Sequence, residues 1–203
     1  GLVMLASATS AIGFEKFGDT YYFLKRQLVY GFLPGVFAFL ICLRLPYAFF
    51  RKSRVIFFVC ALALLLLVLM VGVSFGRTQS WLVFGGFSFQ PAELAKVALI
   101  LFLAGWLDVR RGEAVQTIGR GILPFLCIVG AVAVLLALQP DIGTLAVVLA
   151  IAFGMFFVAG ARWKHIIVVG VLGMIAFGVL VASAPYRVQR FTPFLHPEFD
   201  PQG

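Results

Sequence analysis

The amino-acid sequence predicts an all-α protein, a polytopic bundle of membrane-spanning helices. Of its 203 residues, 63% are hydrophobic and only 12% are charged. Soluble domains are about half apolar and about a quarter charged. The mean hydropathy is +1.08, and the hydrophobic residues fall in long uncharged runs. These observations exclude a disordered chain and an ordinary soluble enzyme.

Seven uncharged runs mark the predicted spans. A helix needs about 20 residues to cross the bilayer core, and four of the runs reach that length. The second run is slightly short and contains Pro34, which predicts a kink. The fourth run is long enough only if residues 91–96 form its first turns. In order, the runs are 1–14, 27–43, 55–76, 97–107, 121–140, 142–161 and 166–186.

The first run starts at Gly1 with no basic segment ahead of it. We therefore expect the tail of a helix and not a signal peptide, which needs a charged start. We also expect the chain to be a fragment truncated at both ends. Within it we predict a single transmembrane domain over residues 1–203, with an outer loop at 74–93 and the start of a large outer loop at 185–203.

The net charge of +8 comes from 16 Lys and Arg residues against eight Asp and Glu. The charges lie in short clusters between apolar runs, where membrane proteins carry topology signals, so they do not indicate a nucleic-acid partner. Nine of the cations lie in segments 44–54, 108–120 and 162–165, and six lie in the alternate segments. The positive-inside rule assigns the nine to the cytoplasm. Segments 77–93, 139–141 and 185–203 then face outside.

Residues 90–96 form the first unusual polar segment, after a turn predicted at Gly85-Gly86. Pro91 suits the first position of a helix, and Glu93 lies in the first turn, where the helix dipole favours an anion. Lys96 follows three residues later, on nearly the same helix face. Two interpretations remain open. Glu93 and Lys96 are either an ion pair at a helix end or part of a polar cavity.

Residues 139–144 form a second helix start of the same kind, in which Gln139 and Pro140 precede Asp141. One such start is explained by capping of the helix. Because two Gln-Pro starts with an acid lie on the same predicted face, they also favour a shared polar pocket.

Residues 185–203 hold two cations three residues apart, Arg187 and Arg190. They bind either lipid phosphates or a pyrophosphate group. By composition alone, Asp200 before Pro201 is a turn residue, and His196 is a hydrogen-bonding loop residue.

In this order and spacing, the segments resemble the FtsW/RodA/SpoVE family, the SEDS proteins of cell shape, elongation, division and sporulation. Residues 90–96 resemble its Q-P-S-E-x-x-K motif, with Ala92 in place of Ser, and residues 139–144 resemble its Q-P-D-x-G-T motif. Residues 186–190 and 197–203 resemble its large outer loop. Of the family's N-G-A-x-R-W motif, this chain has the Trp as Trp81, but Ser80 stands at the Arg position. The resemblance implies about ten membrane helices in the full-length family, about seven of them here.

The resemblance also implies an activity, that of a peptidoglycan glycosyltransferase in the cytoplasmic (inner) membrane of a bacterium. Such an enzyme polymerises lipid II on the outer face of that membrane in cell division or elongation. The acceptor hydroxyl attacks the donor sugar with inversion, and undecaprenyl pyrophosphate leaves. That reaction needs a carboxylate base and cations, or a divalent metal, at the pyrophosphate.

The implied site divides the roles among residues of the predicted outer face. Asp200 is the catalytic base. Glu93 positions Lys96, and Asp141 orders the pocket or helps to hold a metal. The substrate-binding residues are Lys96, Glu93, Gln90, Arg187, Arg190 and Asp141.

The implied cofactor is a divalent cation, Mg or Mn, although no metal-ligand spacing distinguishes its ligands. The implied partners are lipid II, the membrane and a class B penicillin-binding protein transpeptidase, with no nucleic acid. Two alternatives use the same features. A lipid II flippase also needs a basic groove and charges at membrane depth, and a membrane scaffold would recruit the transpeptidase without catalysis.

Overall fold

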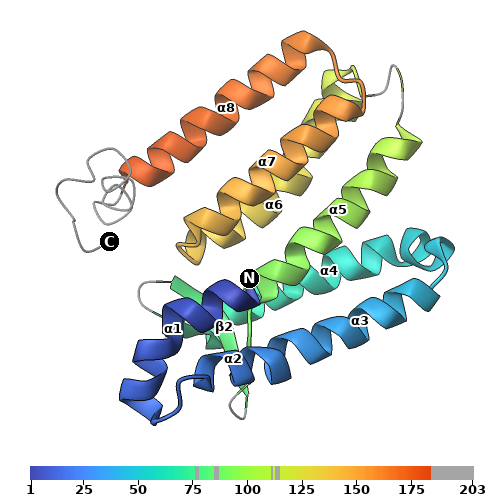
Figure 1. Cartoon of the computed structure of the whole chain (residues 1–203). Helices are drawn as coiled ribbons and strands as arrows, with labels where there is room; N and C mark the ends of the chain where they lie inside the picture. Colours follow the sequence, from blue (N-terminus) through green and yellow to red (C-terminus); the bar gives the residue numbers. More distant parts are fainter. Residues whose placement is uncertain (76–77, 85–86, 111, 113–114, 184–203) are drawn as a thin grey trace. The chain divides into compact units, whose positions relative to one another are not determined.

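The computed structural model describes residues 1–75, 78–84, 87–110, 112 and 115–183. Backbone contacts divide the chain into two compact units, Gly1–Phe50 and Arg51–Gly203, and each is described by itself. Seven helical rods make up most of the described residues (Figure 1). The all-helical fold class is therefore confirmed, with one small sheet that the sequence analysis did not predict.

The first unit begins with α1 (Leu2–Phe17), which ends at Gly18 in the left-handed conformation, with φ 68°. The turn after it is organised by Asp19. Its carboxylate accepts hydrogen bonds from the Lys25 ammonium at 2.7 Å and from the Tyr21 backbone N–H at 3.0 Å. Chiefly through the Lys25 bond, these donors hold the pKa of Asp19 below its ordinary value.

The next rod is a continuous 23-residue apolar helix, Tyr22–Arg44. It consists of α2 (Tyr22–Gln27), a π-helical turn η1 (Leu28–Phe32) and α3 (Leu33–Arg44). Pro34 has no N–H to donate, and its ring crowds the carbonyl four residues earlier. The wider π turn directly before Pro34 is the distortion that a proline causes at this position, where the sequence predicts a kink.

The second unit contains five long helices. They are α4 (Tyr47–Val71), of which residues 51–71 belong to this unit, α5 (Pro91–Val109), α6 (Leu123–Leu138), α7 (Ile142–Val158) and α8 (Trp163–Ala182). A second π turn, η3 (Ile118–Ile122), precedes α6 just before Pro124, as η1 precedes Pro34. Helix α5 does start at Pro91, which confirms that residues 91–96 form the first turns of the helix that contains the fourth apolar run.

The predicted start of the third span, at residue 55, was wrong. The segment 44–54 is mostly helix and not a loop, because α4 already starts at Tyr47 and includes Arg51, Lys52 and Arg54. Among the described residues, four helices are long and apolar enough to cross a membrane, and α7 is a shorter apolar helix. The four are Tyr22–Arg44, Tyr47–Val71, Ile118–Leu138 and Trp163–Ala182.

A three-stranded antiparallel sheet connects α4 to α5 within the predicted outer loop. Its strands are β1 (Val73–Phe75), β2 (Thr78–Phe84) and β3 (Phe87–Phe89), in the order β1-β2-β3. The residues are rich in the aromatic and β-branched types that favour strands. Val73 pairs with Trp81, and Leu82 pairs with Phe89. The turn predicted at Gly85-Gly86 lies outside the described residues, and the strands on either side of it pair Phe84 with Phe87.

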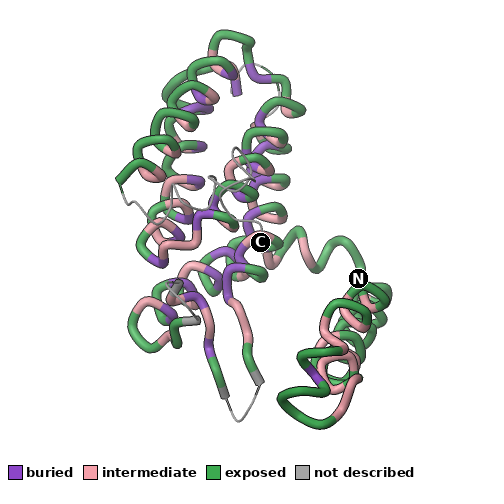
Figure 2. Tube along the Cα trace, turned by 60° about the vertical axis from the view of Figure 1, so that its left-hand side comes forward, coloured by how far each residue is buried: buried purple, intermediate pink, exposed green. Residues whose placement is uncertain are grey.

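Apolar side chains from α4 to α8 form the core of the second unit. Along α5 the buried residues Ala92, Ala95, Leu99 and Leu103 recur every three or four positions, so one helix face is buried. Figure 2 shows this pattern in the other helices of the unit, with buried residues on the sides that face one another. Helix α7 contacts α5, α6 and α8.

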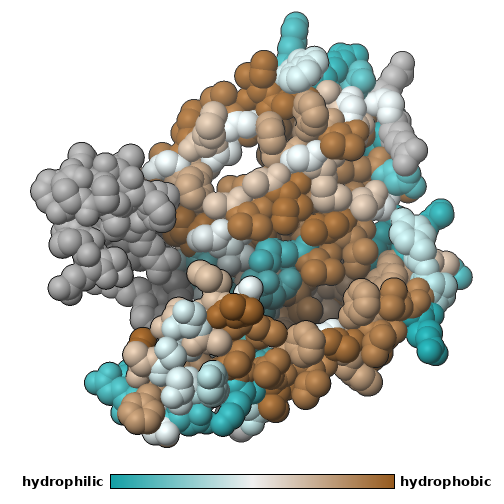
Figure 3. All heavy atoms as spheres, viewed as in Figure 1, coloured by the Kyte–Doolittle hydropathy of each residue, from teal (hydrophilic) through white to brown (hydrophobic). Residues whose placement is uncertain are grey.

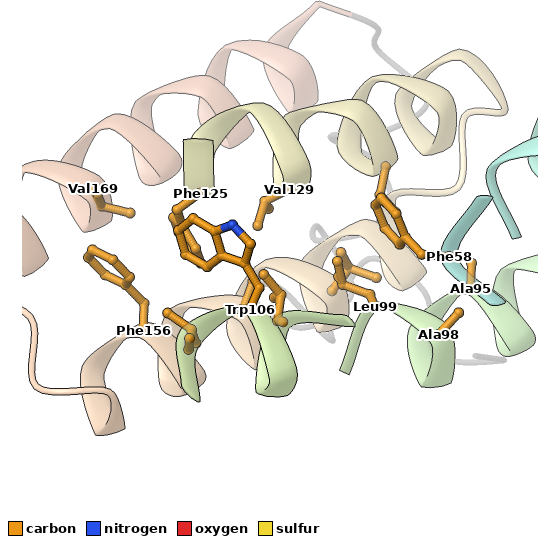
Figure 4. Close-up of a cluster of buried hydrophobic side chains, with 14 of the residues drawn as sticks. Phe58, Ala95, Ala98, Leu99, Trp106, Phe125, Val129, Phe156 and Val169 are labelled. Carbon is orange, nitrogen blue, oxygen red and sulfur yellow. The ribbon is translucent and has the colours of Figure 1, made fainter. Parts of the chain in front are cut away.

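Two aromatic stacks join helices across this core. Phe58 of α4 stacks on Phe102 of α5, and Phe125 of α6 stacks on Phe156 of α7, each with ring centroids 4.4 Å apart. Figure 4 shows core side chains of α4 to α8, including Trp106 and Val169, directed into the space between the helices.

The helices of the second unit alternate in direction, which gives the unit two ends. We call the end at which α5 and α7 start the acidic end, because it holds Glu93 and Asp141. At the other end, the connection from α5 to α6 meets the connection from α7 to α8 (Figure 1). We call it the basic end, because it holds Arg110 and Arg162. The acidic end is the one that the Lys/Arg distribution predicts to face outside.

Candidate functional site

The two polar helix starts of the acidic end are directly joined. Gln90 Nε2 donates a hydrogen bond to Asp141 Oδ2 at 3.0 Å, across 51 residues of sequence. Gln90 immediately precedes α5, and Asp141 immediately precedes α7. The two helix starts that the sequence places on one predicted face are therefore in direct contact, while a polar pocket shared by them stays a prediction.

Asp141 accepts two further hydrogen bonds from Thr144. The Thr144 backbone N–H donates to Oδ1 at 3.2 Å, and its hydroxyl donates to Oδ2 at 2.9 Å. The first is the bond of an N-cap residue to the helix that it starts. All three residues, Gln90, Asp141 and Thr144, are half-buried. Three donors point at the carboxylate, so most of its acceptor capacity is already used within the protein.

Glu93 and Lys96 form an ion pair on the first turns of α5. Lys96 Nζ lies 2.9 Å from Glu93 Oε1, as the three-residue spacing predicts. The Glu93 side chain is 58% exposed, and the Lys96 side chain is 23% exposed. The Lys96 side chain is thus more buried as a whole than the Glu93 side chain that neutralises it. Asp141 is bonded to Gln90 directly before α5, the helix that carries Glu93 and Lys96. All four residues therefore lie at the acidic end.

Gln139, which ends α6, makes a further connection that the sequence analysis did not assign. Its side chain is fully buried, and Nε2 donates to the Leu65 carbonyl of α4 at 3.0 Å. Oε1 of Gln139 is buried without a hydrogen-bond partner among the described residues. The Gln-Pro-acid pattern marked the segment, but only the fold reveals that Gln139 contacts α4.

An apolar cavity of about 620 Å³ lies between α6, α7 and α8. Figure 3 shows the surface hollowed between α8 and α7, with hydrophobic atoms around the opening. The cavity is open because small residues line it, among them Gly130, Ala133, Ala146 and Gly173. Ala146 is five residues after Asp141, which is about 7.5 Å along a helix. The cavity therefore starts less than two turns from the polar contacts of the acidic end.

Three predicted site residues, Asp200, Arg187 and Arg190, lie outside the described residues, as does His196. The structure brings together Gln90 and Asp141, and it pairs Glu93 with Lys96. Within the described part of the chain, no group of three or more His, Cys, Asp or Glu residues is placed to hold a metal ion. The Mg or Mn ion remains a prediction.

The model of the FtsW, RodA and SpoVE proteins, described as "Cell cycle protein", matches residues 1–203. The chain belongs to the FtsW/RodA/SpoVE family. The sequence-based resemblance is therefore confirmed, and with it a multi-pass membrane protein of the kind found in bacteria.

Two curated members of the FtsW/RodA/SpoVE family align with the whole chain. Stage V sporulation protein E of Bacillus subtilis is 38% identical, and the match covers 56% of its length. The probable peptidoglycan glycosyltransferase FtsW of Escherichia coli is 37% identical, and the match covers 49% of its length. The chain thus spans about half the length of these family members.

Two solved structures share the fold. The rod shape determining protein RodA of Thermus thermophilus is 35% identical, with a TM-score of 0.65 over 89% of this chain and 58% of that one. A chain from a structure described as a peptidoglycan synthase complex that coordinates polymerization and crosslinking is 33% identical. It has a TM-score of 0.70 over 100% of this chain and 60% of that one. The fold is accordingly that of RodA-like membrane proteins.

Proposed function

We propose that the full-length protein is a peptidoglycan glycosyltransferase of the bacterial cytoplasmic membrane. It polymerises lipid II on the outer face, in cell division or elongation. The family and the names of its members support this assignment. The observation that carries it in this chain is the proximity of the joined polar helix starts to the apolar cavity. A charged head group at the acidic end and a polyprenyl tail between α6, α7 and α8 fit that arrangement.

The roles proposed for individual residues follow from the charges that the reaction develops. The leaving pyrophosphate needs cations, and we assign Lys96, Arg187 and Arg190 to it. Glu93 neutralises Lys96 when no substrate is bound and holds its side chain in place at 2.9 Å. Asp200 accepts the proton of the attacking hydroxyl. Gln90 and Asp141 border the substrate groove.

The hydrogen bonds that Asp141 accepts do not favour it as the principal ligand of a divalent ion. Its two oxygens already accept three hydrogen bonds from protein donors. Among the described residues, the other carboxylate close to the start of α5 or α7 is Glu93, which is paired with Lys96. The described residues therefore do not offer a fitting ligand set for the Mg or Mn ion. The proposed mechanism uses only the cationic side chains of Lys96, Arg187 and Arg190.

The proposed protein partner is a class B penicillin-binding protein transpeptidase. Support comes from the relative whose structure is described as coordinating polymerization and crosslinking in one synthase complex. Polymerised glycan is the substrate for crosslinking, so the two activities benefit from proximity.

The proposal is tested with purified full-length protein and fluorescent lipid II in detergent. We expect a ladder of glycan products. Asp200→Asn keeps the size of the side chain but removes its basicity, and it should lower the rate by about 10²- to 10⁴-fold. Glu198→Gln is the matched control, because it neutralises a neighbouring carboxylate outside the motif, and it should polymerise at nearly the parent rate.

Two outcomes would contradict these assignments. Polymerisation by Asp200→Asn at the parent rate would show that another residue is the base. If the parent protein makes no polymer but moves lipid II across sealed vesicles, the flippase alternative is correct. Detergent separates the two activities, because transport needs two compartments and polymerisation does not.

A further inference from the structure

We propose that Gln90 and Asp141 form a latch, a donor–acceptor pair that positions the start of α5 against the start of α7 for catalysis. This inference rests on the proposed function. It makes both residues positioning residues, which act through Lys96 and Glu93. They contribute to catalysis through their contact with each other. Neither residue binds a metal or transfers a proton in this proposal.

The first argument is that one carboxylate serves two helices. Asp141 Oδ1 caps α7 by accepting from the Thr144 N–H, while Oδ2 accepts from the Gln90 side chain and the Thr144 hydroxyl. The cap fixes the orientation of the carboxylate on its own helix. Oδ2 is then presented to Gln90 in a defined direction, so the start of α5 is held relative to α7.

The second argument is that the other side of Gln90 is also fixed. Strand β3 ends at Phe89, directly before Gln90. Pro91, directly after it, is fully buried at the first position of α5. Strand β2 contacts α5 as well. Gln90 therefore lies between a sheet and a buried helix start, and its hydrogen bond is the link from this junction to α7.

The third argument is the distance to the charged pair. Lys96 follows Gln90 by six residues, which is about 9 Å along α5. A change in the position or tilt of the α5 start moves Glu93 and Lys96 with it. Misplacement of a reacting group by about 1 Å can cost roughly 100-fold in rate. The latch thus controls where the Lys96 ammonium meets the substrate.

The direction of the hydrogen bond gives a sharp test. An ionised carboxylate only accepts, so the Gln90 amide must donate. Gln90→Glu places two acceptors opposite each other and should lower kcat by roughly 10- to 100-fold. Adding Asp141→Asn supplies an amide donor on the other side and restores one hydrogen bond in the reverse direction. We expect the double variant Gln90→Glu/Asp141→Asn to recover most of the lost kcat.

Two controls keep the result specific. Ser88→Glu adds the same charge to the same segment at an exposed position on β3 and should leave the rate near that of the parent. Gln90→Met removes the donor without adding charge and should lower kcat like Gln90→Glu. All rates are measured per folded protein, well below the unfolding temperature of each variant. A role in stability alone would lower that temperature and leave kcat unchanged.

Three results would overturn the latch. One is a folded Gln90→Glu variant with the kcat of the parent. Another is a folded double variant as inactive as Gln90→Glu, which would show that the Asp141 charge is needed for itself. The third is strictly additive changes in the unfolding temperatures of Gln90→Glu, Asp141→Asn and the double variant. This last measurement needs no activity, so it tests the contact between Gln90 and Asp141, without which there is no latch, even if the parent protein fails to polymerise lipid II.

Discussion

The acidic and basic ends of the second unit use the same kind of connection for different chemistry. At the acidic end, a neutral amide from before α5 donates to the carboxylate that caps α7. At the basic end, Gln116 bridges two connections. Its Nε2 donates to the Gly160 carbonyl at 3.2 Å, and its Oε1 accepts from Arg162 Nε at 3.0 Å. Each end therefore has a glutamine that joins segments more than 40 residues apart.

The difference lies in what surrounds each glutamine. The acidic end combines two carboxylates with a mostly buried lysine side chain and lies beside an apolar cavity. The basic end carries the exposed Arg162, and the Arg110 guanidinium lies over the Trp106 ring at 4.5 Å from its centroid. Cations and aromatic rings at a membrane surface are typical of anchoring and topology. Under the proposed function, the acidic end is the chemical site and the basic end is a structural connection.

The largest effect expected from this comparison is in accessibility. Single cysteines at Ser88 of the acidic end and at Thr117 of the basic end are placed in a background without Cys42, Cys60 and Cys127. Both positions are exposed. An impermeant thiol reagent should label Ser88→Cys in intact cells and Thr117→Cys only after lysis, because the positive-inside rule predicts that the basic end faces the cytoplasm. Equal labelling in intact cells would refute the orientation.

The next effect concerns the ion pair of the acidic end. Glu93→Gln and Lys96→Met should each lower polymerisation by the full-length protein at least 10-fold. The double variant should lose little more, because each single change already breaks the pair at 2.9 Å. The measurement is a double-mutant cycle in the rate of lipid II polymerisation. Independent losses that multiply in the double variant would mean that the residues act separately.

Some features of this end were predictable from the sequence and others were not. The Gln-Pro-acid pattern and helix-dipole physics located both helix starts, and the spacing gave the Glu93–Lys96 pair. The bond from Gln90 to Asp141 joins residues 51 positions apart, so no local pattern reports it. The buried bond of Gln139 to the Leu65 carbonyl has the same explanation, since its acceptor is a backbone atom 74 residues away.

The connecting sheet and the start of α4 were missed for a different reason. Residues 73–89 combine strand-forming aromatic residues with Gly76 and the pair Gly85-Gly86, and between two membrane spans that mixture resembles a loop. Three-residue strands such as β1 and β3 are also too short for a clear alternation. Arg51 and Lys52 look like loop residues by charge, yet long basic side chains are good helix formers and extend to the membrane surface.

A medium-sized effect is expected where α4 and α5 pack near the basic end. The Arg54 side chain lies against Gly105, and a Cβ at Gly105 would approach Arg54 Cδ and Cζ to 2.7 Å. Gly105→Ala forces the flexible end of the Arg54 side chain to move, so it should lower the free energy of unfolding by about 1 kcal/mol, the low end of the range for overpacking. Thermal unfolding in detergent measures this. Gly154→Ala is the matched control, since nothing lies within 4 Å of its added Cβ.

A second variant separates overpacking from other effects of the methyl group. Arg54→Ala added to Gly105→Ala removes the side chain that the new Cβ meets. The double variant should be at least as stable as Gly105→Ala alone. If it is less stable by the full cost of Arg54→Ala, the contact between these residues does not account for the loss.

The smallest effect is expected at the glutamine of the basic end. Gln116→Ala removes two hydrogen bonds that are exposed to solvent, and such bonds contribute about 0.5–1.5 kcal/mol each at most. We expect a small drop in unfolding temperature and a polymerisation rate equal to that of the parent. Arg162→Ala should behave alike, and the two changes should not add, because they break the same bond at 3.0 Å. A large loss of kcat in folded Gln116→Ala would remove the distinction between the ends, since the basic end would then control the reaction as well.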